Sequence, residues 1–224
     1  QFIIGRGAKS SDLPIKDGLQ FINDYVFQHV LNRAAVGVDN SPGTFEYYTS
    51  QVGHGMWIWA ALLPAALAAT LLRARVNDES QANRVRALMG TWAVAGFFFF
   101  AIVQTKFHHY ILPAVPALGM LVAFFLSDVI DGRDRLHPIY AVIGAGIVLL
   151  LARDLTWEPE RWIEMFIFRY DRPWPSGDPW FVDPSTAFVA LGIAGAIAIA
   201  VLGSPWRRLG VALVGGVGLA SCIW

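Results

Sequence analysis

The stretch QTKFHHYILPAVPALGML, residues 104–121, joins a cluster of polar and aromatic side chains directly to an apolar segment that contains two prolines. Proline is tolerated in the first turn of a helix, where a backbone amide needs no partner. Pro113 therefore predicts a helix that begins near Leu112, with Pro116 one turn further along. The apolar residues that follow are typical of a membrane-spanning helix, so Lys106 is expected at the membrane surface.

The composition of the whole chain favours the same class of protein. The 224 residues are 55% hydrophobic and 15% charged, whereas soluble domains carry about 25% charged residues. The formal net charge is zero, so nothing in the overall charge favours a nucleic-acid partner. The single Cys222 excludes an intrachain disulfide. We therefore expect an all-α, polytopic transmembrane helical bundle surrounded by membrane lipids.

Six apolar segments are long enough, or nearly long enough, to cross a bilayer. The region 52–152 holds four of them, at 52–72, 89–104, 110–127 and 139–152. The region 184–224 holds two more, at 184–203 and 209–224, and the last is cut off by the chain end.

Arginines in the short connections predict the orientation of these segments. They fall in loops 73–88, 128–138 and 204–208, which share one side if all six segments cross. Basic loops mark the cytoplasmic side. Residues 1–51, the link 105–109 and the segment 153–183 are then expected on the outer face.

The outer-face segments have distinct patterns. Residues 17–35 show the apolar spacing of an amphipathic helix lying in the membrane interface. His29 and Arg33 are four residues apart and share one face of it, either as solvated side chains or as anion ligands. The Trp- and Pro-rich segment 153–183 is interpreted as an interfacial loop or as a cover over a substrate.

The side chains around Lys106 suit an anion. A helix N-terminus offers free backbone amides and a partial positive charge, and Lys106, His108, His109 and Tyr110 add further donors. Lysine and tyrosine at a membrane boundary are also explained by simple snorkelling and interfacial preference. Adjacent histidines point to different sides of a helix, and the spacing specifies no third ligand, so no metal site is predicted.

Two longer stretches resemble one known family. FINDYVFQHVLNRAAVGVDNSPGTFEYYTSQVGHGMWIWAALLPAAL (21–67) resembles the large outer loop and following span of the PMT/ArnT-like, GT-C class of membrane glycosyltransferases. FFFFAIVQTKFHHYILPAVPAL (97–118) resembles a later signature of that class, a lysine followed by Tyr-Ile-Leu-Pro and a second proline. The chain departs from the pattern at Ile58 and at the histidine pair 108–109.

The resemblance implies a transferase that takes a sugar from a polyprenyl-phosphate donor on the periplasmic face of the bacterial inner membrane. It implies donor phosphate binding by Lys106, Tyr110, Arg33 and His29, and possible substrate contacts from His108, His109, Tyr47 and Tyr48. The catalytic carboxylate of such enzymes is expected upstream of residue 1. The lipid-linked sugar is the only implied cosubstrate, and the resemblance leaves a requirement for a divalent metal open.

The ends of the chain leave alternatives to a complete enzyme. The sequence starts at Gln1 and ends inside an apolar segment, so we expect the C-terminal portion of a longer polypeptide or a chain that works with a partner subunit. A non-catalytic membrane subunit or scaffold, or a lipid-phosphate-binding protein, would show the same features. A transporter is disfavoured because the expected membrane-centre positions hold almost no ionisable residues.

Overall fold

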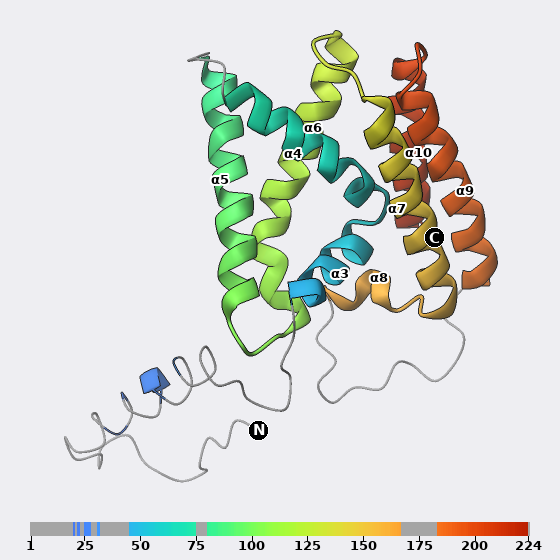
Figure 1. Ribbon diagram of the computed structural model, residues 1–224. Helices are drawn as coiled ribbons and strands as arrows, with labels where there is room; N and C mark the ends of the chain where they lie inside the picture. The colour runs from blue at the N-terminus through green and yellow to red at the C-terminus, as the bar shows by residue number, and fades with distance from the viewer. Residues whose placement is uncertain are drawn as a thin grey trace.

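The computed structural model describes residues 45–74, 80–166 and 183–223, together with positions 20, 22, 25–27 and 31 (Figure 1). Across these residues the regular structure is helical and contains no β-strand, which confirms the predicted all-α class. Most of the predicted amphipathic helix 17–35, including His29 and Arg33, lies outside the described residues, as does most of the Trp- and Pro-rich segment 153–183.

The first expected span is a bent, three-part segment. Helix α3 (Phe45–Met56) passes into the 3₁₀ helix η2 (Trp57–Leu62) and then into α4 (Leu63–Ala74). Trp57 has a φ of 46° at the junction, a left-handed conformation that interrupts an α-helix. Figure 1 shows α3 and α4 inclined to one another at this point, whereas the apolar run 52–72 alone predicts a straight crossing.

The remaining long helices follow the other expected segments. They are α5 (Gln81–Ile102), η3 (His108–Ala114) continued by α6 (Val115–Asp131), α7 (Pro138–Trp157), α9 (Pro184–Leu202) and α10 (Arg207–Ile223), with a short α8 (Arg161–Glu164) between α7 and α9. Five helical segments in the described residues are long and apolar enough to cross a membrane, beginning at Phe45, Gln81, His108, Pro138 and Pro184. Helix α10 has 17 residues and is not among the five, so the sixth crossing stays a prediction.

The first turn of the third α-helical span contains Pro116, one turn later than the predicted position at Pro113. Pro113 lies inside η3, and Pro116 occupies the first turn of α6. The reason is that the chain enters this span through a 3₁₀ helix, whose tighter turns precede the α-helix. The helix then ends at Gly132, whose φ of 78° is the left-handed conformation that closes a helix and favours glycine.

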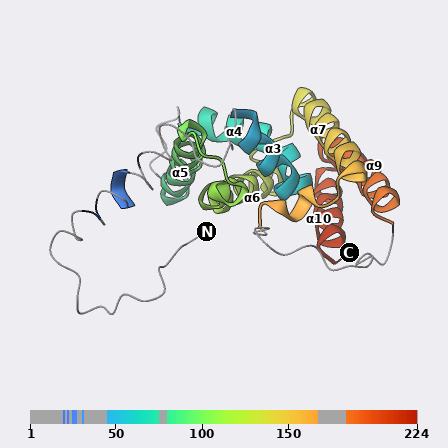
Figure 2. The same ribbon diagram turned by 90° about the horizontal axis from the view of Figure 1, so that it is seen from below.

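Small residues allow the C-terminal helices to pack closely. A Cβ placed on Gly192 of α9 would lie 2.4 Å from the Cβ of Ala152 in α7, and one on Gly210 of α10 would lie 2.3 Å from the Cα of Leu202 in α9. Close backbone approach of this kind drives helix association in membranes. Figure 2 shows α7, α9 and α10 on one side of the molecule, α4, α5 and α6 on the other, and α3 between them.

The connections between the helices gather at two opposite ends of the bundle. The end of α4, the α6–α7 connection and the α9–α10 connection lie at one end, and the 103–107 link, α8 and the start of α9 lie at the other (Figure 1). At the first end, a Cβ placed on Gly132 would lie 2.8 Å from Nη2 of Arg207. This arrangement agrees with the grouping expected for the arginine-rich loops. Which end faces the cytoplasm stays a prediction.

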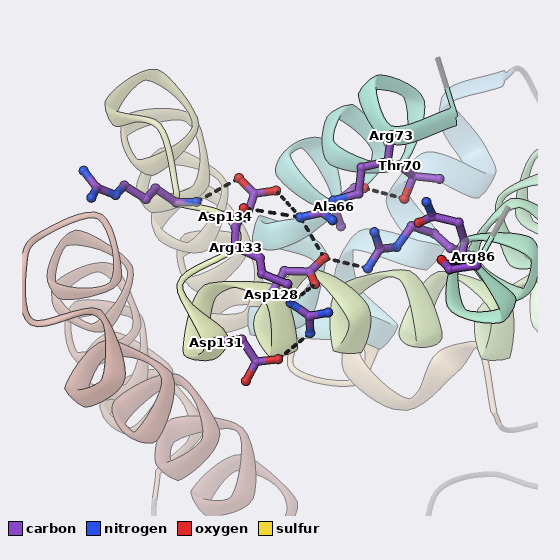
Figure 3. A network of polar contacts seen from close by, with 11 residues as sticks. Ala66, Thr70, Arg73, Arg86, Asp128, Asp131, Arg133 and Asp134 are labelled. Atoms are coloured by element: carbon purple, nitrogen blue, oxygen red, sulfur yellow. Dashed lines mark hydrogen bonds and ion pairs between the residues drawn. The ribbon is translucent and has the colours of Figure 1, made fainter. Parts of the chain in front are cut away.

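A buried carboxylate organises the arginine-rich end (Figure 3). Asp128 near the end of α6 is 1% exposed, and its Oδ2 lies 2.5 Å from Nη2 of Arg86 and 3.3 Å from Nη2 of Arg73. Its other oxygen, Oδ1, lies 3.3 Å from Nε of Arg133. The three arginines come from α5, α4 and the α6–α7 connection, so this one carboxylate joins all three parts. We call these four residues the Asp128 network.

Replacing Asp128 by asparagine should strongly destabilise the bundle. The substitution leaves the buried Arg86 without its anionic partner, and breaking a buried ion pair in this way costs about 3–5 kcal/mol. The measurement is the unfolding midpoint of the purified protein in detergent. Asp131→Asn is the matched control, because Asp131 is on the same helix and pairs with Arg133 at a half-exposed position, where loss of an ion pair costs at most about 1 kcal/mol. Equal effects of the two substitutions would contradict the role given to Asp128.

Candidate functional site

Lys106 is the centre of the candidate site, and it lies inside the protein. Its residue is 4% exposed, and its ammonium donates hydrogen bonds to the backbone carbonyls of Phe100 (3.1 Å), Ala101 (2.6 Å) and Val103. These are the last carbonyls of α5 and of the residue after it, which no helical amide can satisfy. The ammonium therefore closes the C-terminus of α5 and also faces the negative end of the helix dipole.

This position differs from the sequence expectation. The proline pattern predicts Lys106 beside the N-terminus of the helix that follows, whereas the structure places its charge on the C-terminus of the helix that precedes it. The reason is that Lys106 follows Ile102 by four residues, within reach of carbonyls that need a donor. Burial lowers the pKa of the Lys106 ammonium below its usual value. The three carbonyls accept hydrogen bonds from the ammonium, which favours its charged form.

The tyrosine pair before the first expected span contributes to the same site. The ring of Tyr48 lies under the ammonium of Lys106, with 5.3 Å between Nζ and the ring centroid. Such a cation–π contact is strongest when both groups are desolvated, and Tyr48 is fully buried. The Tyr47 ring contacts that of Tyr48 edge to face at 5.2 Å. Tyr48 is thus a core residue beneath Lys106 and not a member of a surface aromatic belt.

The two histidines and Tyr110 form the aromatic part of the site. They lie at the start of η3, where His109 stacks on Phe107 with 5.9 Å between centroids. His109 also contacts Tyr110 and His108 edge to face, at 5.0 Å and 5.4 Å. The three side chains are half-buried, so each keeps part of its surface available at this end of the bundle.

Six of the eight residues predicted as donor or substrate contacts therefore come together. We call them the Lys106 cluster: Tyr47, Tyr48, Lys106, His108, His109 and Tyr110. None of the six is a carboxylate, and all carry groups that can donate hydrogen bonds. In the described residues no group of three His, Cys, Asp or Glu side chains is arranged to hold a metal ion.

The five long apolar helices define the chain as a polytopic helical membrane protein, with the donor-rich Lys106 cluster at one end of its bundle.

Comparison with known proteins relates part of this chain to proteins named as arabinosyl transferases. It is 34% identical over 116 residues to the undecaprenyl phosphate-alpha-4-amino-4-deoxy-L-arabinose arabinosyl transferase of Pectobacterium carotovorum, covering 50% of the chain and 19% of that protein. The chain is 29% identical over 133 residues to an arabinosyl transferase of the same name from Sodalis glossinidius, and 24% identical over 173 residues to one from Photorhabdus laumondii. These matches cover 56% and 72% of the chain.

The matches confirm, over part of the chain, the resemblance that the two sequence signatures predict. The chain spans 22% and 27% of the length of the Sodalis and Photorhabdus relatives. No family model and no solved structure matches the chain.

Replacing Lys106 by methionine should loosen the end of α5. Methionine keeps the length and much of the volume of the side chain but donates no hydrogen bonds, so the carbonyls of Phe100 and Ala101 lose a charged donor. A hydrogen bond to a charged group contributes about 1.5–3 kcal/mol, so amide hydrogen exchange at the end of α5 and in the 103–107 link should become at least about tenfold faster. Exchange in α9 serves as the internal control and should not change. Unchanged exchange around residues 100–107 would show that the ammonium does not hold this helix end.

Proposed function

We propose that this chain provides the donor-binding portion of a membrane glycosyltransferase. The enzyme would transfer a sugar from a polyprenyl-phosphate carrier to an acceptor at the periplasmic face of the bacterial inner membrane. The observation that carries the proposal is the Lys106 cluster, a buried cation with tyrosine and histidine side chains beside it at one end of a membrane bundle. The partial similarity to proteins named for undecaprenyl phosphate supports the same chemistry.

In this proposal the cluster stabilises the phosphate that leaves when the sugar is transferred. The negative charge on that phosphate grows as the bond to the sugar breaks, and a fixed cation nearby lowers the energy of the transition state. Lys106 would exchange one or more of its carbonyl partners for a phosphate oxygen, which carries more negative charge. The lysine side chain suits such an exchange because its ammonium is a compact charge on a flexible stem.

The other residues of the cluster would position the phosphate. Tyr110 and Tyr47 are half-buried and can donate through their hydroxyl groups, and the histidines beside them can contact the head group of the donor. His29 and Arg33 remain predicted phosphate ligands from the outer-face segment. The carboxylate that activates the acceptor would come from sequence upstream of residue 1.

A transfer assay with two substitutions in the cluster tests the proposal. Polypeptide that includes this chain would be supplied with an undecaprenyl-phosphate-linked sugar. Lys106→Gln should lower kcat/KM by about 10- to 100-fold, the loss expected for one charge-assisted hydrogen bond. Tyr110→Phe keeps the ring and its packing but removes one donor, so it should lower kcat/KM by about tenfold.

Arg208→Gln is the control for a lost positive charge. Arg208 is exposed at the start of α10, at the opposite end of the bundle, so this variant should retain its activity. Undiminished turnover in Lys106→Gln would contradict the proposal. Lys106 would then be a structural cap, and the chain would fit a non-catalytic membrane subunit better.

A further inference from the structure

A groove of about 800 Å³ lies beside α3. Its apolar walls come from α4, α5, α6 and α7, with Leu63, Leu67, Val94, Phe97, Leu118 and Leu150 among the lining residues. Two of these side chains, Val94 and Leu150, are exposed in the described structure. Walls of this kind fit a hydrocarbon chain.

One end of the groove is polar, and its polar side chains come from two helices. Glu46, Ser50 and His54 are spaced by four residues on α3, so they share one face of that helix. Asp154 of α7 lines the groove beside His54. The groove thus has a polar strip at the same end of the bundle as the Lys106 cluster.

His54 has an unused hydrogen-bonding atom in this strip. The residue is 4% exposed, and its Nδ1 is held by the backbone carbonyl of Ser50 at 2.9 Å. Its Nε2 makes no hydrogen bond to any described residue, and it lies 3.7 Å from Oδ2 of Asp154, too far for a hydrogen bond. A buried polar atom without a partner is unfavourable, so a ligand donor that reaches both His54 Nε2 and the Asp154 carboxylate would be stabilised.

The charges that line the groove decide which ligand it accepts. Two carboxylates, Glu46 and Asp154, are among the lining residues, and none of the described lining residues is a lysine or an arginine. Arg153 pairs with Oδ1 of Asp154 at 2.9 Å, and together with Arg161 it lines an adjoining cavity that shares Asp154 with the groove. The two carboxylates would attract an ammonium or hydroxyl group, whereas the groove lining offers an anionic head group no cation.

The groove and the Lys106 cluster use different side chains. Tyr48 of α3 contacts Lys106 and does not line the groove, whereas Ser50 and His54 of the same helix line it. None of the six residues of the Lys106 cluster is among the lining residues.

We propose that this groove binds a single-chain amphiphile whose head group is an ammonium or a hydroxyl and not a phosphate. The head would bind at His54, Asp154 and Glu46, and the chain would lie along α4, α5 and α7. This site does not depend on the proposed transfer reaction, because it uses neither Lys106 nor a phosphate.

Binding of two probes with the same C18 chain tests the proposal. Purified protein in detergent is titrated with oleylamine or with oleyl phosphate, and the bound complexes are quantified by native mass spectrometry. Val94→Trp fills the groove from an exposed position on α5, so the difference in binding between the parent protein and this variant measures binding in the groove. Binding in the groove should favour oleylamine over oleyl phosphate by about tenfold or more. Asp154→Asn should weaken oleylamine binding in the groove by about tenfold, as expected for loss of one charged hydrogen bond.

Glu158→Gln is the matched control, because Glu158 is an exposed carboxylate one turn beyond Asp154 that does not line the groove. It should leave oleylamine binding unchanged, which would attribute the loss in Asp154→Asn to the groove. The proposal is overturned if Val94→Trp removes no oleylamine binding, if the portion it removes favours oleyl phosphate, or if Asp154→Asn binds oleylamine as well as the parent protein does. None of these results depends on sugar transfer.

Discussion

A bilayer offers no hydrogen-bonding partner to a polar group inside it, so each buried polar side chain of this bundle needs a partner from the chain. Asp128 at one end of the bundle is surrounded by three arginines. Lys106 at the other end is surrounded by three carbonyls. The His54 Nε2 atom is a buried polar atom without such a partner in the described structure, and for that reason it marks a place where a ligand would be stabilised.

The two satisfied charges have different consequences for function. The Asp128 network links α4, α5 and the α6–α7 connection through bonds made entirely within the protein, so it fixes the helices that carry the other end. Lys106 is bound to neutral carbonyl oxygens, which an anionic phosphate oxygen can replace. The same side chain can therefore hold the end of α5 in the absence of substrate and bind the donor phosphate in its presence.

Local sequence patterns predicted much of the fold. Apolar length located the five long helices, and the paired prolines placed the start of the third span to within a few residues. The bend at Trp57 was not predicted, because no glycine, asparagine or proline in the apolar run marks the position that adopts the left-handed conformation. The start of α5 was predicted at residue 89, eight residues after its observed start at Gln81. Its first turns carry Arg84 and Arg86, which are typical of a loop, and the pairing of Arg86 with Asp128 is not visible in the sequence.

Contacts between distant residues explain what sequence reasoning missed in the candidate site. Tyr48 belongs to the first of the two family-like stretches, and Lys106 and Tyr110 belong to the second. The structure brings residues of both stretches together. Which helix end the Lys106 ammonium contacts depends on where α5 ends, and the sequence pattern did not locate that end. His54 and Asp154, which lie side by side in the groove, are 100 positions apart in the chain, so neither residue alone indicated a site.

The proposed function requires the Lys106 end of the bundle to face the outside of the cell, and labelling with a membrane-impermeant maleimide tests this most directly. In a Cys222→Ser background, single cysteines would be placed at two exposed positions, Glu160→Cys near α8 and Arg135→Cys in the α6–α7 connection. Glu160→Cys is expected to be labelled in intact cells whose outer membrane has been made permeable, and Arg135→Cys only after the inner membrane is disrupted. The reverse pattern would place the Lys106 cluster on the cytoplasmic side and contradict the proposed function.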